Sequence, residues 1–418
     1  MRRAHNVFNV AVGNFFEMYD FMVFGLYASY IAKSFFPNNN VYISLLLSFL
    51  TFGAGFLMRP LGAIILGAYI DRHGRKKGLL LTLSLMAIGT ISIALTPDYA
   101  TIGVAAPIII LLGRLIQGFS AGAELGGVSV YLAEIADKHN KGFFVSWQSA
   151  SQQMAIAIAA LFGYILNEIF AKPFMESFGW RIPFIFGCLI LPVLFLQRSK
   201  LEESREFEAR KIHPSFKAII TSAIKNCGFL VACSFMVMLT TVSFYMITAY
   251  TPTFAKIELG LSESRAFILT LIIALSNFIL LPLMGALSDK IGRARQLLLF
   301  SALFIITAYP VLLFVTKSNL YSSVIIGELW FSILYAGYNG AMVIALVEIV
   351  PKEIRSISFS LAYSIATAIY GGFTPAIATQ LIHFTQNKAA PAIWLSFAAF
   401  CSLVIILRLS ARIRNAAL

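Results

Sequence analysis

The sequence predicts an all-α membrane protein of twelve transmembrane helices, arranged as two six-helix halves. The first observation is composition, because 59% of the 418 residues are hydrophobic and only 12% are charged, whereas soluble domains carry about 25% charged residues. The second is that the apolar residues form many separate runs, each about twenty residues long and able to cross roughly 30 Å of hydrocarbon as a helix. The third is a short stretch of the first half that returns in the second half.

The apolar runs define the individual spans. They are continuous and rich in Leu, Ile, Ala and Phe rather than alternating with period two, so they favour helices over an outer-membrane barrel. The first run contains acidic residues and lacks a small-residue cleavage site, which indicates a membrane helix and not a secretory signal. The expected spans are 8–34, 41–70, 79–96, 102–134, 143–170, 182–197, 226–255, 264–288, 297–316, 321–347, 356–385 and 391–410.

Basic residues predict how these spans are oriented. Twelve spans place both termini on one side of the membrane, and Lys and Arg are concentrated in the termini and in the loops of that same side. Basic loops stay in the cytoplasm, so both termini and the segment 198–225 are expected there. This distribution also accounts for the net charge of +13 without a nucleic-acid partner.

The repeat predicts the domain organisation. The stretch from Gly67 to Lys77 returns from Gly285 to Arg295, with Asp, a basic residue, Gly and Arg at matching places. A second echo relates Glu134-Ile135 to Glu348-Ile349. We therefore expect an N-terminal half at 1–197, a charged cytoplasmic linker at 198–225 and a C-terminal half at 226–418.

The Gly-xxx-Asp-Arg-x-Gly-Arg-Lys stretch that begins at Gly67, with its partial second copy, resembles the signature of the major facilitator superfamily. In that family this charged loop clamps the two halves together on the cytoplasmic side. The resemblance thus implies the major facilitator fold and assigns gating to Asp71, Arg72, Arg75, Asp289 and Arg293.

Further likenesses narrow the family. Arg114-Leu-Ile-Gln117-Gly118 matches an element whose buried arginine is linked in the superfamily to proton coupling. The stretches Gly13 to Phe21 and Arg59 to Gly62 are similar to the metabolite:proton symporters, and residues 113–155 look like the citrate–proton symporters. The resemblance implies a bacterial inner-membrane carrier that moves citrate, or a related tri- or dicarboxylate, together with protons by alternating access.

Acidic residues within the spans are candidates for proton coupling, because a charge at the centre of a membrane helix costs roughly 3 kcal/mol. Glu17 and Asp20 are three residues apart and neighbour each other on one helix face, so we expect one of them to hold a proton. Alternatively, either acid pairs with Arg59 or Arg114 and holds the bundle together. Glu124 is also within a span, where it either pairs with an arginine or relays a proton.

An anionic substrate needs fixed positive charge and hydrogen-bond donors. Arg59 and Arg114 are the two cations within the expected spans, and guanidinium binds carboxylate through two parallel hydrogen bonds. Arg114 is the stronger candidate, because the resemblance implies that its helix lines the cavity in the superfamily. Arg59 precedes Pro60 and could instead stabilise a kink or pair with the acids of the first span. The remaining candidate substrate-binding residues are polar side chains of the fifth, seventh and tenth spans: Gln148, Gln152, Tyr245, Thr248, Tyr338 and Asn339. The amides of the fifth span are either a ligand-binding wall, which we favour, or contacts between helices.

Glycines and the remaining reactive residues favour structural roles. Gly118, Gly122 and Gly126 recur every four residues and, with Gly53, Gly55, Gly62 and Gly67 of the second span, predict close helix packing. The four Cys and five His are scattered, so no metal site is expected, and no phosphate-binding loop or catalytic arrangement is present in the sequence. We expect a monomeric carrier in the lipid bilayer, not an enzyme, with H+ as coupling ion and no cofactor. The alternative cargo is a zwitterionic osmolyte such as betaine or proline, or another organic acid such as shikimate.

Overall fold

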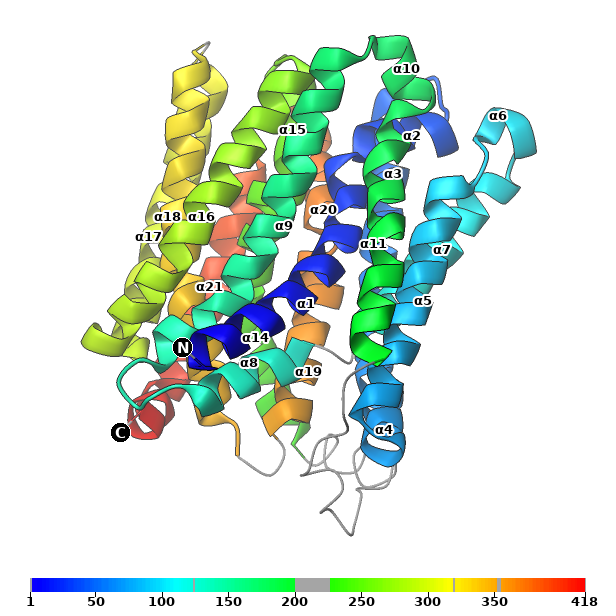
Figure 1. Ribbon diagram of the computed structural model, residues 1–418. Helices are drawn as coiled ribbons and strands as arrows, with labels where there is room; N and C mark the ends of the chain where they lie inside the picture. The colour runs from blue at the N-terminus through cyan, green and yellow to red at the C-terminus, as the bar shows by residue number, and fades with distance from the viewer. Residues whose placement is uncertain (1, 123–124, 200–225, 319, 352–354, 418) are drawn as a thin grey trace.

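The computed structural model describes residues 2–122, 125–199, 226–318, 320–351 and 355–417, and in these ranges the regular structure consists of helices without strands. The first six expected spans correspond to α1 (Arg2–Leu26) with α2 (Ala28–Phe35), α3 (Val41–Leu57) with α4 (Arg59–His73), α5 (Arg75–Leu95), α7 (Ala105–Ala121) with α8 (Leu125–Ile135), α9 (Lys141–Ile169) and α11 (Ile182–Ser199) (Figure 1). Short helices α6 (Tyr99–Ile102), α10 (Lys172–Ser177) and η1 (Gly179–Arg181) lie between them.

The last six expected spans are helical as well. They correspond to α14 (Cys227–Tyr245), η2 (Met246–Tyr250) and α15 (Thr251–Ile257), then α16 (Glu263–Ile291), α17 (Arg293–Lys317), α18 (Tyr321–Ile349), α19 (Arg355–Ala366) with η4 (Thr367–Gly371) and α20 (Thr374–Thr385), and α21 (Pro391–Ala417). Two of these segments, η2 and η4, are single-turn π-helices, which are frequent at functional sites.

Length and hydropathy identify the membrane-crossing helices. Within the described ranges, nine helices are long and apolar enough to cross a membrane, and two shorter apolar helices, Ala105–Ala121 and Gly179–Pro192, fall in two further expected spans. The remaining expected span is the first, formed by α1 and α2, whose polar residues Asn14, Glu17 and Asp20 lower its hydropathy. The chain is therefore an all-α, multi-pass membrane protein, as predicted.

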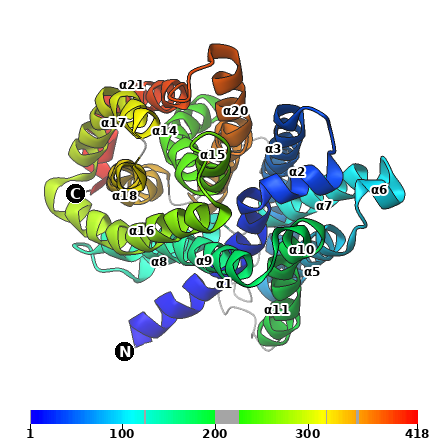
Figure 2. The ribbon, with the colours of Figure 1, turned by 90° about the horizontal axis from the view of Figure 1, so that it is seen from above.

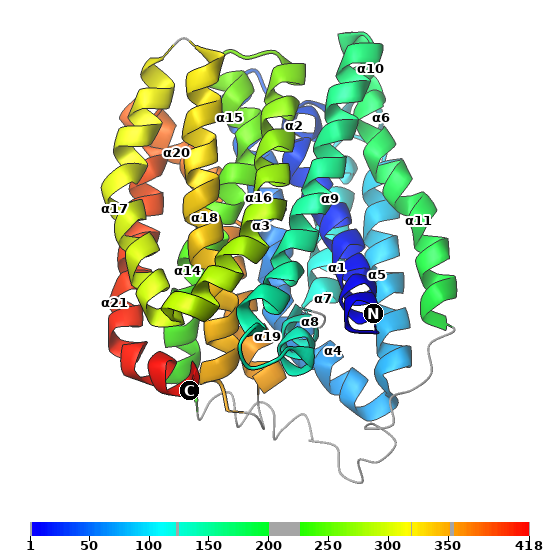
Figure 3. The same cartoon turned by 60° about the vertical axis from the view of Figure 1, so that its left-hand side comes forward.

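The helices gather in two groups when the bundle is viewed along its length. In Figure 2, α3, α5, α7 and α11 lie on one side and α14, α17, α18 and α21 on the other, while α9 and α16 pack along each other at the seam. Both chain ends lie toward the same end of the bundle, called here the terminal end, and α10 lies at the opposite end (Figures 1 and 3). The predicted linker falls almost entirely outside the described residues.

Glycines allow the expected close approach of helices in the first group. A Cβ on Gly118 would lie 1.6 Å from the carbonyl oxygen of Gly55, and one on Gly122 would lie 2.1 Å from the carbonyl oxygen of Arg59. The backbone of α7 thus contacts α3 and α4 directly, which confirms the predicted role of these two glycines. A Cβ on Gly67, in contrast, would meet no described atom within 4 Å.

The sequence repeat is reproduced in backbone geometry. Gly74 separates α4 from α5 with φ 99°, and Gly292 separates α16 from α17 with φ 92°. Side chains other than glycine rarely adopt this φ, so both copies need glycine at the turn.

Candidate functional site

A small cavity lies between the N- and C-terminal halves of the chain, with room for about one water molecule. Its lining residues come from α1, α4 and α9 of the N-terminal half and from α14, α19 and η4 of the C-terminal half: Met18, Arg59, Gln152, Thr241, Phe244, Tyr245, Tyr363 and Thr367. Arg59, Gln152 and Tyr245 were predicted from sequence as binding residues. The cavity combines one cation with amide, hydroxyl and aromatic groups, the kinds of side chain that orient a small molecule in a binding site.

Arg59 supplies the positive charge of this cavity. It is the first residue of α4, where α3 ends at Leu57 and Pro60 occupies the first turn, a position that tolerates the missing N–H of proline. The side chain is 3% exposed, and its guanidinium lies 5.0 Å from the ring centre of Phe21. No carboxylate of a described residue lies within ion-pair distance of it, and its Nε is buried without a hydrogen-bond partner.

Arg114 is placed differently. It is fully buried in α7, and its guanidinium stacks over Phe21 at 4.1 Å, with Phe24 and Phe52 around it. Its Nη1 donates to Gln117 Oε1 at 2.9 Å and to the carbonyl of Phe21 at 3.3 Å, and its Nη2 donates to the carbonyl of Phe52 at 3.4 Å. Arg114 is not among the residues that line the cavity. Its Nη donors are engaged inside the N-terminal half, and its Nε, like that of Arg59, is buried without a partner among the described residues.

A hydrogen-bonded chain links Arg114 to Asp20. Gln117 Nε2 donates to Thr90 Oγ1 at 2.9 Å, and Thr90 Oγ1 lies 3.3 Å from Asp20 Oδ2. Asp20 is 5% exposed and seats against α11, where a Cβ on Gly187 would lie 2.3 Å from Asp20 Oδ1. The predicted acid–arginine relationship is therefore mediated by Gln117 and Thr90 and is not a direct ion pair.

The other two predicted coupling acids have different surroundings. Glu17 lies one turn before Asp20 on α1 and is half-buried. Glu124 falls outside the described residues, so its predicted role concerns a part of the chain between α7 and α8 that the structure does not describe.

The amides of the fifth span, α9, make contacts between helices and also contribute to the wall of the cavity. Asn14 Nδ2 donates to the carbonyl of Gln148 at 2.7 Å and to Ser151 Oγ at 2.8 Å, which ties α1 to α9. Gln152 Nε2 lies 3.4 Å from Asn14 Oδ1, and Gln152 also lines the cavity. Gln148 accepts from Ser149 through Oε1, while its Nε2 is buried without a partner among the described residues.

The predicted binding residues of the C-terminal half also divide into residues that line the cavity and residues that make contacts within the bundle. Tyr245 lines the cavity, whereas Thr248 donates to the carbonyl of Phe244 at 2.5 Å inside η2. Tyr338 donates to the carbonyl of Met236 at 2.6 Å, which ties α18 to α14. Asn339 is 1% exposed, and neither of its amide atoms has a partner in the described parts of the chain.

Sequence reasoning missed two lining residues of the eleventh span. Tyr363 and Thr367 are four residues apart and therefore share one face of a helix. That spacing of hydroxyl-bearing side chains within the span 356–385 is the signal that could have identified them.

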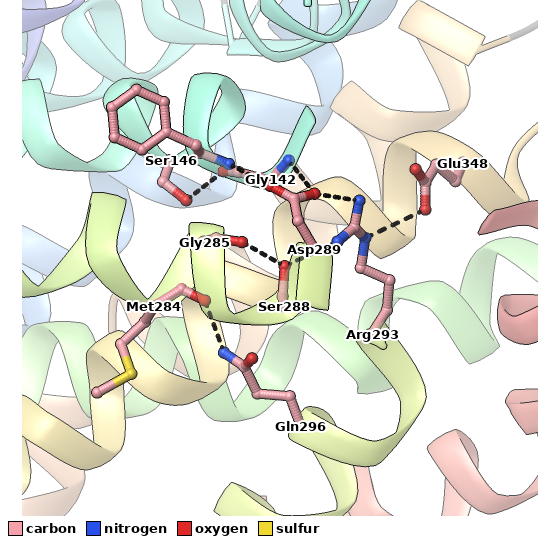
Figure 4. Close-up of polar contacts among 10 residues, drawn as sticks. Gly142, Ser146, Met284, Gly285, Ser288, Asp289, Arg293, Gln296 and Glu348 are labelled. Atoms are coloured by element: carbon pink, nitrogen blue, oxygen red, sulfur yellow. Dashed lines mark hydrogen bonds and ion pairs between the residues drawn. The ribbon is translucent and has the colours of Figure 1, made fainter. Parts of the chain in front are cut away.

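Asp289 closes the terminal end of the cavity by joining the two groups of helices (Figure 4). Its carboxylate accepts backbone hydrogen bonds from Gly142 at 2.9 Å and Phe143 at 3.1 Å, at the start of α9. A helix N-terminus stabilises an anion through its free N–H groups and its dipole. A Cβ on Gly285 would lie 2.4 Å from the carbonyl oxygen of Gly142, so the two backbones touch beside this contact.

Arg293 holds Asp289 in place from within the second group. Its Nη2 lies 2.7 Å from Asp289 Oδ1, its Nε lies 3.5 Å from Glu348 Oε2, and its Nη1 donates to Ser288 Oγ at 3.0 Å (Figure 4). The side chains of Asp71, Arg72 and Arg75, in the first copy of the repeat, lie outside the described residues. The second copy is thus the one whose contacts are visible.

Other contacts close the opposite end. Tyr42 of α3 is hydrogen-bonded to Gln380 of α20, and its ring stacks on His383 with centroids 3.9 Å apart. Deeper in, a Cβ on Gly53 would lie 2.5 Å from the ring of Phe373. These contacts join the N- and C-terminal halves at both ends of the bundle.

Sequence comparison places this geometry among known proteins. The family model described as Major Facilitator Superfamily matches residues 10–375. The citrate-proton symporter of Klebsiella pneumoniae is 52% identical over 402 residues, which cover 96% of this chain and 90% of that protein. The proline/betaine transporter of Escherichia coli K12 is 30% identical over 408 residues, covering 94% of this chain and 81% of the relative.

Structural comparison agrees on the fold. The crystal structure of a D-xylose-proton symporter superposes with a TM-score of 0.76, covering 96% of each chain at 17% sequence identity.

Proposed function

Because the chain belongs to the major facilitator superfamily and is a membrane transporter rather than an enzyme, we propose that it moves citrate, or a related tri- or dicarboxylate, together with protons. The 52% identity to a citrate-proton symporter, over nearly the full length of both chains, supports this substrate class. The two halves would expose the cavity to one side of the membrane at a time.

The observation that carries the substrate class is the buried guanidinium of Arg59 in the cavity, which no described carboxylate neutralises. A buried cation without a counter-ion costs several kcal/mol, and a substrate carboxylate offsets this cost through two parallel hydrogen bonds. Gln152, Tyr245 and Thr241 add donors around it. Arg114, by contrast, supports the site indirectly. It donates to the backbone carbonyls of Phe21 and Phe52, and it orients Gln117, which donates to Thr90.

Proton coupling is assigned to the acids of the first half. Asp20 is buried, and Thr90 is its hydrogen-bonding neighbour on α5. When Asp20 is ionised, the Thr90 hydroxyl can donate to it. When Asp20 carries a proton on Oδ2, it can itself donate to Thr90 Oγ1, and that hydroxyl then donates to the carbonyl of Met86, at 3.0 Å. This change in the hydrogen bonding of Thr90 passes the protonation state of Asp20 on to Gln117 and Arg114. Glu17 and Glu124 are the other acids to which we assign proton transfer.

Asp289 and Arg293 form the proposed gate at the terminal end, and Asp71, Arg72 and Arg75 its counterpart in the first copy. Gln148, Thr248, Tyr338 and Asn339 are assigned to the second layer around the ligand. We propose that the terminal end faces the cytoplasm of a bacterial inner membrane, in line with the basic loops. A monomer in the lipid bilayer, with H+ as coupling ion and no cofactor, completes the proposal.

Transport assays test this function. The full chain is reconstituted in proteoliposomes, and radiolabelled citrate uptake is measured with and without an inward proton gradient. We expect uptake that rises with the gradient and collapses with a protonophore. Gradient-independent uptake would exclude proton coupling, and the absence of citrate uptake would exclude the substrate.

A zwitterionic osmolyte is the alternative cargo, and the aromatic lining of the cavity favours it. Phe244, Tyr245 and Tyr363 surround the space beside Arg59, and aromatic rings bind quaternary ammonium groups. The 30% identical proline/betaine transporter points the same way. Unlabelled betaine, proline and shikimate are therefore tested as competitors of citrate uptake, and the cargo is the compound that competes at the lowest concentration.

A further inference from the structure

A second buried carboxyl lies in the C-terminal half, far along the chain from the acids of α1. Glu328 is on α18, is 7% exposed, and its Oε2 has no hydrogen-bond partner among the described residues. It is the eighth residue of α18, so it lies about 10 Å along the helix from the opposite end of the bundle. Sequence reasoning could have found it, because it is an acid within the expected span 321–347.

No described charge compensates Glu328. The described parts of α9, α14, α16, α17 and α21 pack against α18, yet none brings a Lys, Arg or His within ion-pair distance of this carboxyl. Its polar neighbour is the hydroxyl of Thr251, the first residue of α15, which donates to the carbonyl of Met246 at 3.2 Å and accepts through its lone pairs. A carboxylate buried in this way without a cation costs several kcal/mol, whereas a neutral carboxylic acid costs far less.

Glu328 begins a polar stripe on α18. Ser332, Tyr335 and Asn339 follow it at spacings of four, three and four residues, which places all of them on one helix face. These three side chains are at most 1% exposed, and Ser332 Oγ and both amide atoms of Asn339 are buried without described partners. Burial of such a group is unfavourable when no partner satisfies its hydrogen-bonding capacity. A row of them is therefore more consistent with a polar route than with packing.

The stripe runs behind the wall of the cavity. Tyr335 packs on Phe244 with ring centroids 6.0 Å apart, and Phe244 lines the cavity. Tyr335 also lies near Gln153, which follows the lining residue Gln152 on α9 and whose two amide atoms are buried without a hydrogen-bond partner among the described residues. The route thus connects the surroundings of Glu328 with those of the substrate.

Thr251 links Glu328 to the closure of the opposite end. It directly follows the π-helix η2, which contacts the first half, since Tyr250 packs on Phe49 at 5.8 Å and a Cβ on Gly25 would lie 2.9 Å from Ala249. Opening of this end would move η2 and α15 away from α1 and α3, and water would then reach the carboxyl.

We propose that Glu328, with Thr251, is a second proton-binding site, which takes a proton from water at the open opposite end and keeps it while the carrier is occluded. The carboxylate gains the proton of a hydronium ion and leaves a water molecule, and it returns the proton to water at the terminal end after the switch. This inference rests on the proposed proton symport, and it adds one proton per transport cycle to those carried by the first half.

The test compares Glu328→Gln, which mimics the protonated acid, with Glu168→Gln, an exposed acid of α9 as matched control. In proteoliposomes, proton uptake is read from a trapped pH dye and citrate uptake from the radiolabel. We expect E328Q to lower the proton-to-citrate ratio by one and to retain citrate counterflow, which needs no net proton movement, while E168Q behaves as wild type. An unchanged ratio in an active E328Q would overturn the proposal.

Infrared difference spectroscopy gives a readout that is independent of the cargo. Wild-type protein and E168Q should show, beside the bands of the first-half acids, a further carbonyl band of a buried protonated carboxyl that titrates with pH, and E328Q should lack this further band. If E328Q is inactive, this band decides the question, and its persistence in E328Q refutes the site. If wild type fails to transport citrate while the band disappears in E328Q, the proposed cargo is wrong and the proton site stands.

Discussion

Replacing Asp289 by Asn should open the terminal end of the carrier. Asparagine keeps the shape of the side chain but removes its charge, so it weakens two contacts to the N–H groups of Gly142 and Phe143 and the 2.7 Å ion pair with Arg293. Hydrogen bonds to a charged group contribute about 1.5–3 kcal/mol each, and Asn retains part of them. We therefore expect the closed form to lose about 2–3 kcal/mol.

At about 1.4 kcal/mol per factor of ten, this loss shifts the closed-to-open ratio by roughly 30- to 150-fold. The assay is labelling of Thr367→Cys, a cavity residue, by a membrane-impermeant maleimide added from the terminal end, with the four native cysteines replaced. We expect labelling at least about tenfold faster in D289N.

The control is Asp98→Asn. Asp98 also caps a helix, since it accepts from the N–H of Thr101 at 3.0 Å, but it is exposed and lies at the opposite end. Labelling in D98N should match the parent. Equal rates in D289N and the parent would show that this carboxylate does not hold the terminal end closed.

Substitutions at three further positions test the site and the packing. Arg59→Gln should weaken citrate binding, measured by isothermal titration, at least about 100-fold, because a bidentate charged contact is lost. Arg59→Lys keeps the charge and should retain part of the affinity. Equal affinities of the two variants would argue against Arg59 as the cation that binds the ligand. Gly187→Ala places a Cβ 2.3 Å from Asp20 Oδ1, so it should shift the pH profile of uptake with citrate counterflow preserved; an unchanged profile would remove Asp20 from coupling. Gly118→Ala places a Cβ 1.6 Å from a backbone oxygen, so it should lower the melting temperature by several degrees, and a wild-type value would contradict the tight packing of α7.

The polar residues of the site show how far sequence reasoning reached. A scarce charge within an apolar span marks a functional candidate because its burial is costly wherever it lies, and this rule identified Arg59, Arg114 and Asp20. The resemblance favoured Arg114, yet it is Arg59 that faces the cavity without a described counter-ion, whereas the Nη donors of Arg114 are used by Gln117 and backbone carbonyls. That distinction depends on which helices surround each guanidinium, and the sequence does not contain this information locally.

The sequence by itself determined the helices and their repeat. Each apolar run must satisfy its own backbone hydrogen bonds in a membrane, so a local property of twenty residues suffices to predict a helix. The glycine turns at Gly74 and Gly292 were equally local, because φ near 90° requires glycine.

Only the tertiary structure decided which distant groups meet. The contact of Asp289 with the start of α9, the joining of Asp20 to Arg114 through Thr90, and the placement of Glu328 beside Thr251 all bring together residues from different helices. Helices in a lipid environment pack through shape and a few hydrogen bonds, without a strong hydrophobic pattern that distinguishes their faces. The partner of each polar side chain is therefore set by the packing of the whole bundle.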